Sequence, residues 1–452
     1  MQSIITLEVL TSVSENGFSL DELVISTRKL FEQEGMPGLI GLVLRLLDEN
    51  ISLRLRQNHS DWRPTSCCAQ SDYEFQDRQE RRFRTSAGEI KIHWRRLRCR
   101  ACGKSTTPLR EFLGLAAYQS KTAELEKTVM EVVSEQSYRR GSQHLDTIGH
   151  IPVPKSTAHR WVAESSCDEI DTGTETFDQL FADGTGYKKR CNKKAGTSNR
   201  GDLRIALGVD KQGFVVPLGS WSGESWAEIA QAIQGKREDN QPVADVLVSD
   251  GERGLSEALA DLCNEHQRCG WHFIHDLNFT MWQDGASKTE RDDKRQELIN
   301  IIGIELPEED FQAVSSQERE EISSKLDKAR SDLEQLYNYL MSKGYDEAAG
   351  YVNRGGKNIF TYLERWLKTG LITPRVSSMI ERMMREIARR LKRIAFGWSP
   401  AGAAKMARII IKRFTSAVQW EKYWKDRLKI DGKILMVLRN VRIVSPQPLG
   451  RY

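Results

Sequence analysis

Long apolar runs are missing from this sequence of 452 residues. No stretch approaches the roughly 20 uncharged apolar residues that a membrane-spanning helix needs, so we expect no association with a membrane. The first residues, MQSIITLEVLTSVSENGF, lack the basic start of a signal peptide. Internal repeats and low-complexity tracts are also missing, which argues against a repeat array. With 39% hydrophobic and 29% charged residues, the chain is expected to form folded domains in the cytoplasm.

A disulfide framework is not expected either, because the eight cysteines of a cytoplasmic protein stay reduced. Only Cys99 and Cys102 have the Cys-x-x-Cys spacing of a zinc knuckle, and Gly103 follows where a tight turn favours positive φ. A structural zinc ion is therefore predicted, with the ligands Cys67, Cys68, Cys99 and Cys102. Neighbouring residues rarely both reach one ion, so His59 or His93 is an alternative ligand. A β-ribbon without metal is the other alternative.

The net charge of +4 says little, but the basic residues are crowded into two stretches, 77–110 and 382–413. Two basic faces predict a polyanionic partner, and double-stranded DNA is the first expectation. Each stretch taken alone also fits an ordinary solvated helix face. The arginines predicted to contact DNA are Arg95, Arg96 and Arg98 in the first stretch, and Arg382 and Arg385 in the second.

Hydrophobic periodicity and composition divide the chain into segments. They are a helical segment at 1–60, a Cys/Arg-rich zinc-ribbon-like segment at 61–115, a helix-turn-helix at 116–170, an α/β core at 175–275, a helical insertion at 276–370, and final helices with a tail at 371–452. In the helix-turn-helix, a helix that begins near Ser156 would bring Lys155, His159 and Arg160 to the major groove of DNA. A small structural helical bundle is the alternative.

The segment from 175 to 275 predicts a mixed sheet. Its expected order is three antiparallel strands (Phe177–Tyr187, Leu203–Val209, Phe214–Gly219), a helix, the buried strand Ala244–Ser249, a helix, and a short strand near Gln267–Trp271. This order resembles that of an RNase H-like fold, in which the first and fourth strands lie side by side.

This strand order predicts that two carboxylates lie close together. Asp183 and Asp250, each followed by glycine, would come together at the ends of the first and fourth strands. Neighbouring carboxylates repel each other unless a cation lies between them, and Mg²⁺ or Mn²⁺ suits oxygen ligands. Two such ions activate a water or a 3′-hydroxyl for attack on a phosphodiester. The alternative for each Asp-Gly pair is an ordinary turn at the end of a strand.

Four motifs in this order resemble the Mutator-like DDE transposases, which include many bacterial insertion-sequence transposases. They are Asp183-Gly184, Asp250-Gly251, the box Cys269-Gly270-Trp271-His272, and Ser378-Met379-Ile380-Glu381-Arg382. The resemblance covers roughly residues 175–415 and implies that Asp183, Asp250 and Glu381 bind two divalent ions. It implies an accessory role for Cys269 and His272, with His275 as a weaker alternative. The family often has Asn where Ser378 stands, and Glu386 is the competing third carboxylate.

The sequence as a whole thus predicts a DNA transposase that binds terminal inverted repeats through its N-terminal half. Its core would then cleave a strand and transfer the 3′-hydroxyl to target DNA. Bringing the two ends of the DNA element together would require at least a homodimer. A DNA-binding protein of this kind is expected to associate with the nucleoid. The alternatives are an RNase H-like nuclease or resolvase without strand transfer, and a non-catalytic DNA-binding regulator derived from a transposase.

Overall fold

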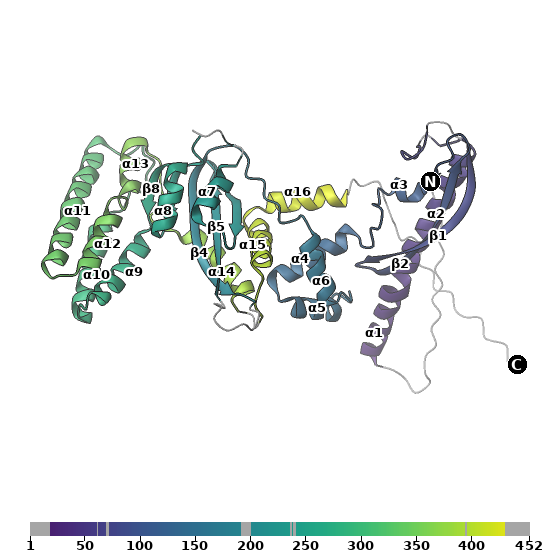
Figure 1. The fold of residues 1–452 in the computed structure, drawn as a ribbon, viewed down its shortest axis with the longest axis horizontal. Coiled ribbons are helices and arrows are strands. Elements are labelled where there is room, and N and C mark those ends of the chain that lie inside the picture. The colour runs from purple at the N-terminus through teal and green to yellow at the C-terminus, as the bar shows by residue number, and fades with distance from the viewer. Residues whose placement is uncertain are drawn as a thin grey trace. The chain divides into compact units, whose positions relative to one another are not determined.

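The structure is a computed structural model that describes residues 19–60, 62–68, 72–190, 200–235, 237, 241–393 and 396–429. The chain forms two compact units (Figure 1). The first unit contains the chain up to Lys127 and from Glu421 onward, and the second unit contains Thr128 to Trp420. Cys191 and the weak strand expected at 433–444 lie outside the described residues. No helix of the described chain is both long and apolar enough to span a membrane.

The first unit begins with a continuous helical rod. Helix α1 (Leu20–Leu30) passes through a π-helical turn (Phe31–Gly35) into α2 (Met36–Arg56). Pro37 lies in the first turn of α2, directly after the π-helical turn, and does not end the helical rod. The long hairpin of β1 (Tyr73–Thr85) and β2 (Gly88–Cys99) follows, with β3 (Ser105–Thr106) beside β2 and the short α3 (Pro108–Phe112) after it.

The hairpin packs against α2 through one face. Ile90, Ile92 and Trp94 alternate along β2 and are buried, as period-2 side chains on one face of a strand must be. Ile40 and Leu44 of α2 cover them. The strands are 13 and 12 residues long.

Three helices connect this hairpin to the sheet of the second unit. They are α4 (Ala123–Glu135), α5 (Tyr138–Thr147) and α6 (Lys155–Glu164). Helix α6 begins at Lys155, close to the expected start near Ser156, and Pro154 is its N-cap. Its Ala158, Trp161 and Val162 are buried.

The second unit contains a five-stranded mixed sheet in the order β6-β5-β4-β7-β8. Its strands are β4 (Phe177–Lys188), β5 (Arg200–Val209), β6 (Val215–Trp221), β7 (Ala244–Ser249) and β8 (Cys263–Arg268). Strands β4, β5 and β6 are antiparallel, whereas β7 is parallel to both β4 and β8. The predicted adjacency of the first and fourth strands is confirmed. Strand β8 ends before residue 270, so Trp271 lies on a helix and its expected place in a strand is wrong.

Helices cover this sheet. Helices α7 (Trp226–Gln234) and α8 (Arg253–Leu259) pack on it through Trp226, Ile229 and Leu255, which share a core with Leu180 and Ala182 of β4. Helices α14 (Ser378–Leu391) and α15 (Pro400–Thr415) pack against β4 and β6.

Between β8 and α14 the chain is helical and has its own core. Its helices are α9 (Gly270–Gln283), α10 (Lys288–Ile302), α11 (Ser316–Ser342), α12 (Asp346–Gly356) and α13 (Thr361–Thr369), which lie together in Figure 1. Arg365 of α13 fixes this segment to the sheet. Its buried guanidinium lies 2.8 Å from Asp178, 3.5 Å from Asp245 and 3.9 Å from Glu265.

Candidate active site and candidate zinc centre

Asp183 and Asp250 are brought together by the parallel pairing of β4 with β7. The ladder ends with Phe181 opposite Val248, so the same register two residues on sets Asp183 opposite Asp250. Asp250 follows the last residue of β7, as expected. Asp183 lies inside β4 and not at its end, because β5 continues to pair with β4 as far as Lys188 after β7 has stopped.

The charge of Asp183 is poorly compensated. Burial is the largest cause that raises its pKa to about 6, and the neighbouring carboxylates of Asp250 and Glu381 act in the same direction. The backbone N–H of Gly184, which donates to Asp183 Oδ1 over 2.7 Å, and the imidazole of His272 act in the opposite direction. Asp183 therefore lies within electrostatic reach of both other predicted carboxylates.

Asp250 is held by a tight turn. Its Oδ1 accepts the backbone N–H of Glu252 at 2.9 Å, and Gly251 between them has φ +80°. The side chain of Arg268, only 6% exposed, lies against this turn and donates to the Tyr351 hydroxyl at 2.7 Å. Two nitrogens of the Arg268 guanidinium, Nε and Nη1, are buried and have no hydrogen-bond partner among the described residues.

Glu381 lies in the first turn of α14, and Ser377 holds it there. The Ser377 hydroxyl is 3.3 Å from Glu381 Oε1. Both the backbone N–H and the hydroxyl of Ser377 are also 3.3 Å from the Cys269 sulfur. The competing carboxylate Glu386 is 2.5 Å from Arg389 on its own helix. Ser378 is the serine of the motif expected from the sequence, but the contacts with Glu381 and Cys269 are made by Ser377.

Cys269 and His272 form a polar pair at the start of α9. His272 Nδ1 is 3.4 Å from the Cys269 sulfur. Burial opposes ionisation of Cys269, but hydrogen bonds from His272 and Ser377 outweigh it and lower its pKa to about 7. Burial likewise opposes the charged His272, yet Cys269 and Asp250 raise its pKa overall. His275 instead hydrogen bonds to Asp276 at 2.8 Å and stacks on Trp271.

Two sets of side chains in the described chain have every candidate ligand atom within 4.8 Å of the others. One is Cys269, His272 and Glu381, and the other is the cysteine quartet of the first unit. The three carboxylates together do not form such a set among the described residues. Glu381 is thus shared between the predicted carboxylate site and the Cys-His pair.

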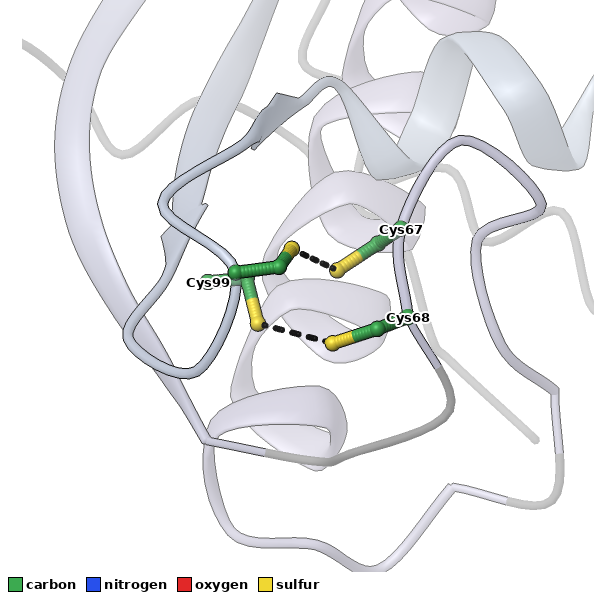
Figure 2. Close-up of side chains that lie close together, drawn as sticks. Cys67, Cys68 and Cys99 are labelled. Carbon is green, nitrogen blue, oxygen red and sulfur yellow. Dashed lines mark hydrogen bonds between the residues drawn. The ribbon is translucent and has the colours of Figure 1, made fainter.

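The quartet consists of the four cysteines predicted from spacing. The sulfurs of Cys67 and Cys102 are 3.5 Å apart, and those of Cys68 and Cys99 are 3.6 Å apart. Figure 2 shows Cys67 and Cys68 on one loop, with their thiols turned toward the segment that carries Cys99. Tetrahedral zinc, with bonds of about 2.3 Å, holds its sulfurs roughly 3.8 Å apart, so the spacing fits a zinc ion.

Both adjacent cysteines reach the quartet, so the alternative with a histidine ligand is not needed. Cys67 ends the turn at 65–67 and Cys68 follows it, so their side chains are not forced to opposite sides as in a strand. Gly103 has φ +71° in the second knuckle, as predicted. His93 lies in mid-hairpin opposite Glu80 and is not part of the quartet, and neither is His59. Backbone N–H groups of Cys68 and Lys104 lower the pKa of the Cys102 thiol to about 6.

The predicted DNA-contact arginines of the hairpin differ in their surroundings. Arg95 is largely buried, 3.2 Å from Asp48 and 3.0 Å from Glu49 of α2. Arg96 pairs with Asp77 across the hairpin. Arg98 is exposed. Arg95 therefore stabilises the packing of the hairpin on α2.

The predicted contacts on α6 and α14 are at the surface. Lys155, His159 and Arg160 are exposed, although the His159 ring packs edge-on against Tyr138 at 5.2 Å. Arg382 and Arg385 are exposed on α14. These five side chains are available to a partner in a way that Arg95 is not.

Much of the second basic stretch serves the fold. Arg408 lies 2.7 Å from the buried Asp168, and Lys405 lies 3.4 Å from it. Arg413 lies 2.7 Å from Glu135. Arg390 is buried and donates to the Val133 carbonyl at 2.8 Å, and burial lowers its pKa to about 10. The basic composition of this stretch therefore overstates its free positive charge.

No protein family matches the chain, and no curated protein sequence matches it either. Among solved structures, the strand transfer complex of the Drosophila P element transposase is similar to 70% of this chain and 82% of that chain. The sequence identity is 13% and the TM-score is 0.26. A similarity this weak establishes neither a common fold nor a common function, so the proposals below rest on the geometry of the site.

Proposed function

We propose that this chain is a metal-dependent DNA transposase whose active site consists of Asp183, Asp250 and Glu381. The observation that carries the proposal is the parallel register of β4 and β7, which sets Asp183 opposite Asp250, with Glu381 of α14 near enough to contribute to the raised pKa of Asp183. The strand order β6-β5-β4-β7-β8, in which β4 and β7 are parallel neighbours, supports an RNase H-like core.

The donor set fits a pair of divalent ions. Carboxylate oxygens are the ligands that Mg²⁺ and Mn²⁺ prefer. Burial first, and then the charges of Asp250 and Glu381, raise the pKa of Asp183, and a bound cation would offset both effects. Bound there, such ions would polarise the scissile phosphodiester and activate a water or a 3′-hydroxyl. Asp183 and Asp250 would hold the ions from two adjacent strands. Ser377 and Cys269 would orient Glu381 toward them through the contacts described above.

The remaining parts of the chain would bind and align DNA. We propose that the cysteine quartet holds a structural zinc ion that fastens the loop at 65–68 to the end of β2. The exposed basic side chains of α6 and α14 would contact DNA phosphates and bases. Pairing of two element ends would require at least a dimer.

The test is cleavage and strand transfer with Mg²⁺ on DNA that carries the sequences flanking the reading frame. Asp183→Asn, Asp250→Asn and Glu381→Gln should each lower cleavage on the order of a hundredfold or more, with DNA binding retained. Glu386→Gln, on the same helix, is the matched control and should leave cleavage unchanged. Full cleavage by all three site variants would overturn the assignment. Cleavage without joining to new DNA would indicate a nuclease or resolvase, and binding without cleavage a regulator.

A further inference from the structure

Helix α9 has two apolar faces, and only one of them is used in the fold. Phe273, Leu277 and Met281 are buried in the core of the helical segment. On the other face, Trp271 is 52% exposed, Phe279 53% and Trp282 57%. Large aromatic side chains gathered on an exposed face mark a binding surface more often than chance exposure.

Phe279 and Trp282 border a cavity of about 500 Å³ between α9 and α10. Its lining residues are His275, Asn278, Phe279, Trp282, Arg291 and Arg295. The ring centroids of Phe279 and Trp282 are 5.7 Å apart with an interplanar angle of 31°. At the near end, Trp271 stacks on His275 at 4.9 Å and 12°. The surface therefore offers flat ring faces at both ends.

The lining is positively charged, with two arginines and no carboxylate. Arg291 donates to Asn278 Oδ1 at 2.8 Å, which holds its guanidinium across the groove, and its buried Nε has no partner among the described residues. Arg295 is exposed. Cations beside exposed rings suit an anionic polymer with aromatic bases better than the apolar face of another protein.

The position of α9 links this groove to the carboxylates. The helix begins after Cys269, which contacts Ser377, and its first turn carries His272, which has a ring nitrogen within 4.8 Å of a Glu381 carboxylate oxygen. From Trp271 to Trp282 the helix rises about 16 Å, at 1.5 Å per residue. A strand leaving the carboxylates along α9 would pass the aromatic residues in succession.

We propose that this α9–α10 groove binds unpaired nucleotides of the DNA strand next to the cleavage point, with bases stacked on Trp282 and Trp271 and phosphates on Arg291 and Arg295. The inference deepens the proposed function and rests on it for the identity of the polymer as DNA. It adds a property that the carboxylates alone do not imply, namely a preference for DNA with an unpaired tail over blunt duplex.

The probe is a duplex with a short single-stranded tail that contains 2-aminopurine, whose fluorescence falls when the base stacks. The full chain should quench this probe and bind it more tightly than the blunt duplex. Trp282→Ala should remove the quenching and weaken binding of the tailed DNA about tenfold, because stacking contributes roughly 1–3 kcal/mol per base. Trp282→Phe should restore much of both, while Trp282→Leu should not. Phe214→Ala, which removes a 69% exposed ring on the β5–β6 turn, is the matched control.

The outcomes separate the two proposals. Asp250→Asn should abolish cleavage and leave the quenching unchanged. If Trp282→Ala binds tailed DNA as the unaltered chain does, the groove proposal is wrong even where cleavage still depends on Asp250. If Trp282→Leu also restores binding, the contact is apolar and not stacking. If Trp282→Ala instead changes only the sedimentation of the DNA-free chain, the face binds a second copy, which also overturns the proposal.

Discussion

The guanidinium of Arg268 lies where a side chain at residue 251 would have to be. A Cβ added to Gly251 would come within 1.2 Å of Arg268 Nη1. The turn after Asp250 and the end of β8 are therefore closely fitted, and the glycine is needed for space as well as for its φ of +80°.

We expect Gly251→Ala to displace either Arg268 or the Asp250 turn. The free energy of unfolding should fall by roughly 2–4 kcal/mol, since positive-φ strain adds to a steric clash. The control is Gly213→Ala, whose φ is +85° but whose added Cβ meets no described atom within 4 Å. Thermal unfolding of both variants is the measurement. Equal losses would show that Arg268 does not fill the space, and Arg268→Ala should restore part of the stability of Gly251→Ala.

The sheet order and the meeting of Asp183 with Asp250 were predictable from the sequence, because strand periodicity and the Asp-Gly pairs are local signals. The contacts that orient the site were not. Ser377 and Cys269 are 108 residues apart, and nothing in either sequence neighbourhood indicates that they touch. Arg268 directly precedes the Cys269-Gly270-Trp271-His272 box but was not predicted as a site residue, because its burial depends on the placement of β8 and α12. The four cysteines of the quartet were predicted, but a histidine alternative stayed open because sequence spacing does not show the turn that brings both Cys67 and Cys68 to the centre.

Asp183→Asn should stabilise the metal-free protein at neutral pH. The pKa of Asp183 is raised to about 6, so the folded state favours the protonated acid. The protonated Asp183 therefore contributes to the free energy of unfolding below the unfolded pKa, and this contribution is lost as pH rises through about 6. At pH 7.5 the variant should gain on the order of 2 kcal/mol, a few degrees in Tm, and at pH 3.5 it should gain little.

The stabilisation of the chain by divalent ions should increase with pH, opposite to the contribution of the protonated Asp183. Mg²⁺ or Mn²⁺ requires the ionised carboxylate, so the rise in Tm on adding ion should be present at pH 7.5 and weak at pH 5. Asp183→Asn should remove this rise. A rise that is equal at both pH values, or that survives in the variant, would contradict the placement of the ions at Asp183.

Cys269→Ala should weaken the positioning of Glu381, because Ser377, which contacts Glu381, would lose its contact with Cys269. The substitution removes the sulfur that contacts Ser377, so the start of α14 loses its tie to α9. Cleavage should fall about tenfold while the affinity for DNA stays the same. Cys263→Ala, in a partly buried cysteine at the start of β8, is the control and should cleave as the unaltered chain does. Normal cleavage by Cys269→Ala would show that Glu381 needs no such support.

The cysteine quartet should contain one zinc ion per chain. Cys102→Ala should release it and lower the Tm of the hairpin unit, since a structural zinc contributes directly to folding. Metal analysis of the purified chain and the variant is the measurement, with Cys263→Ala again as the control. A full complement of zinc in Cys102→Ala would place the metal elsewhere.

The most direct test of the central claim is anomalous X-ray diffraction from crystals of the chain grown with Mn²⁺. The account predicts manganese bound by oxygens of Asp183, Asp250 and Glu381. Manganese held by Cys269, His272 and Glu381, with both aspartates unligated, would contradict it.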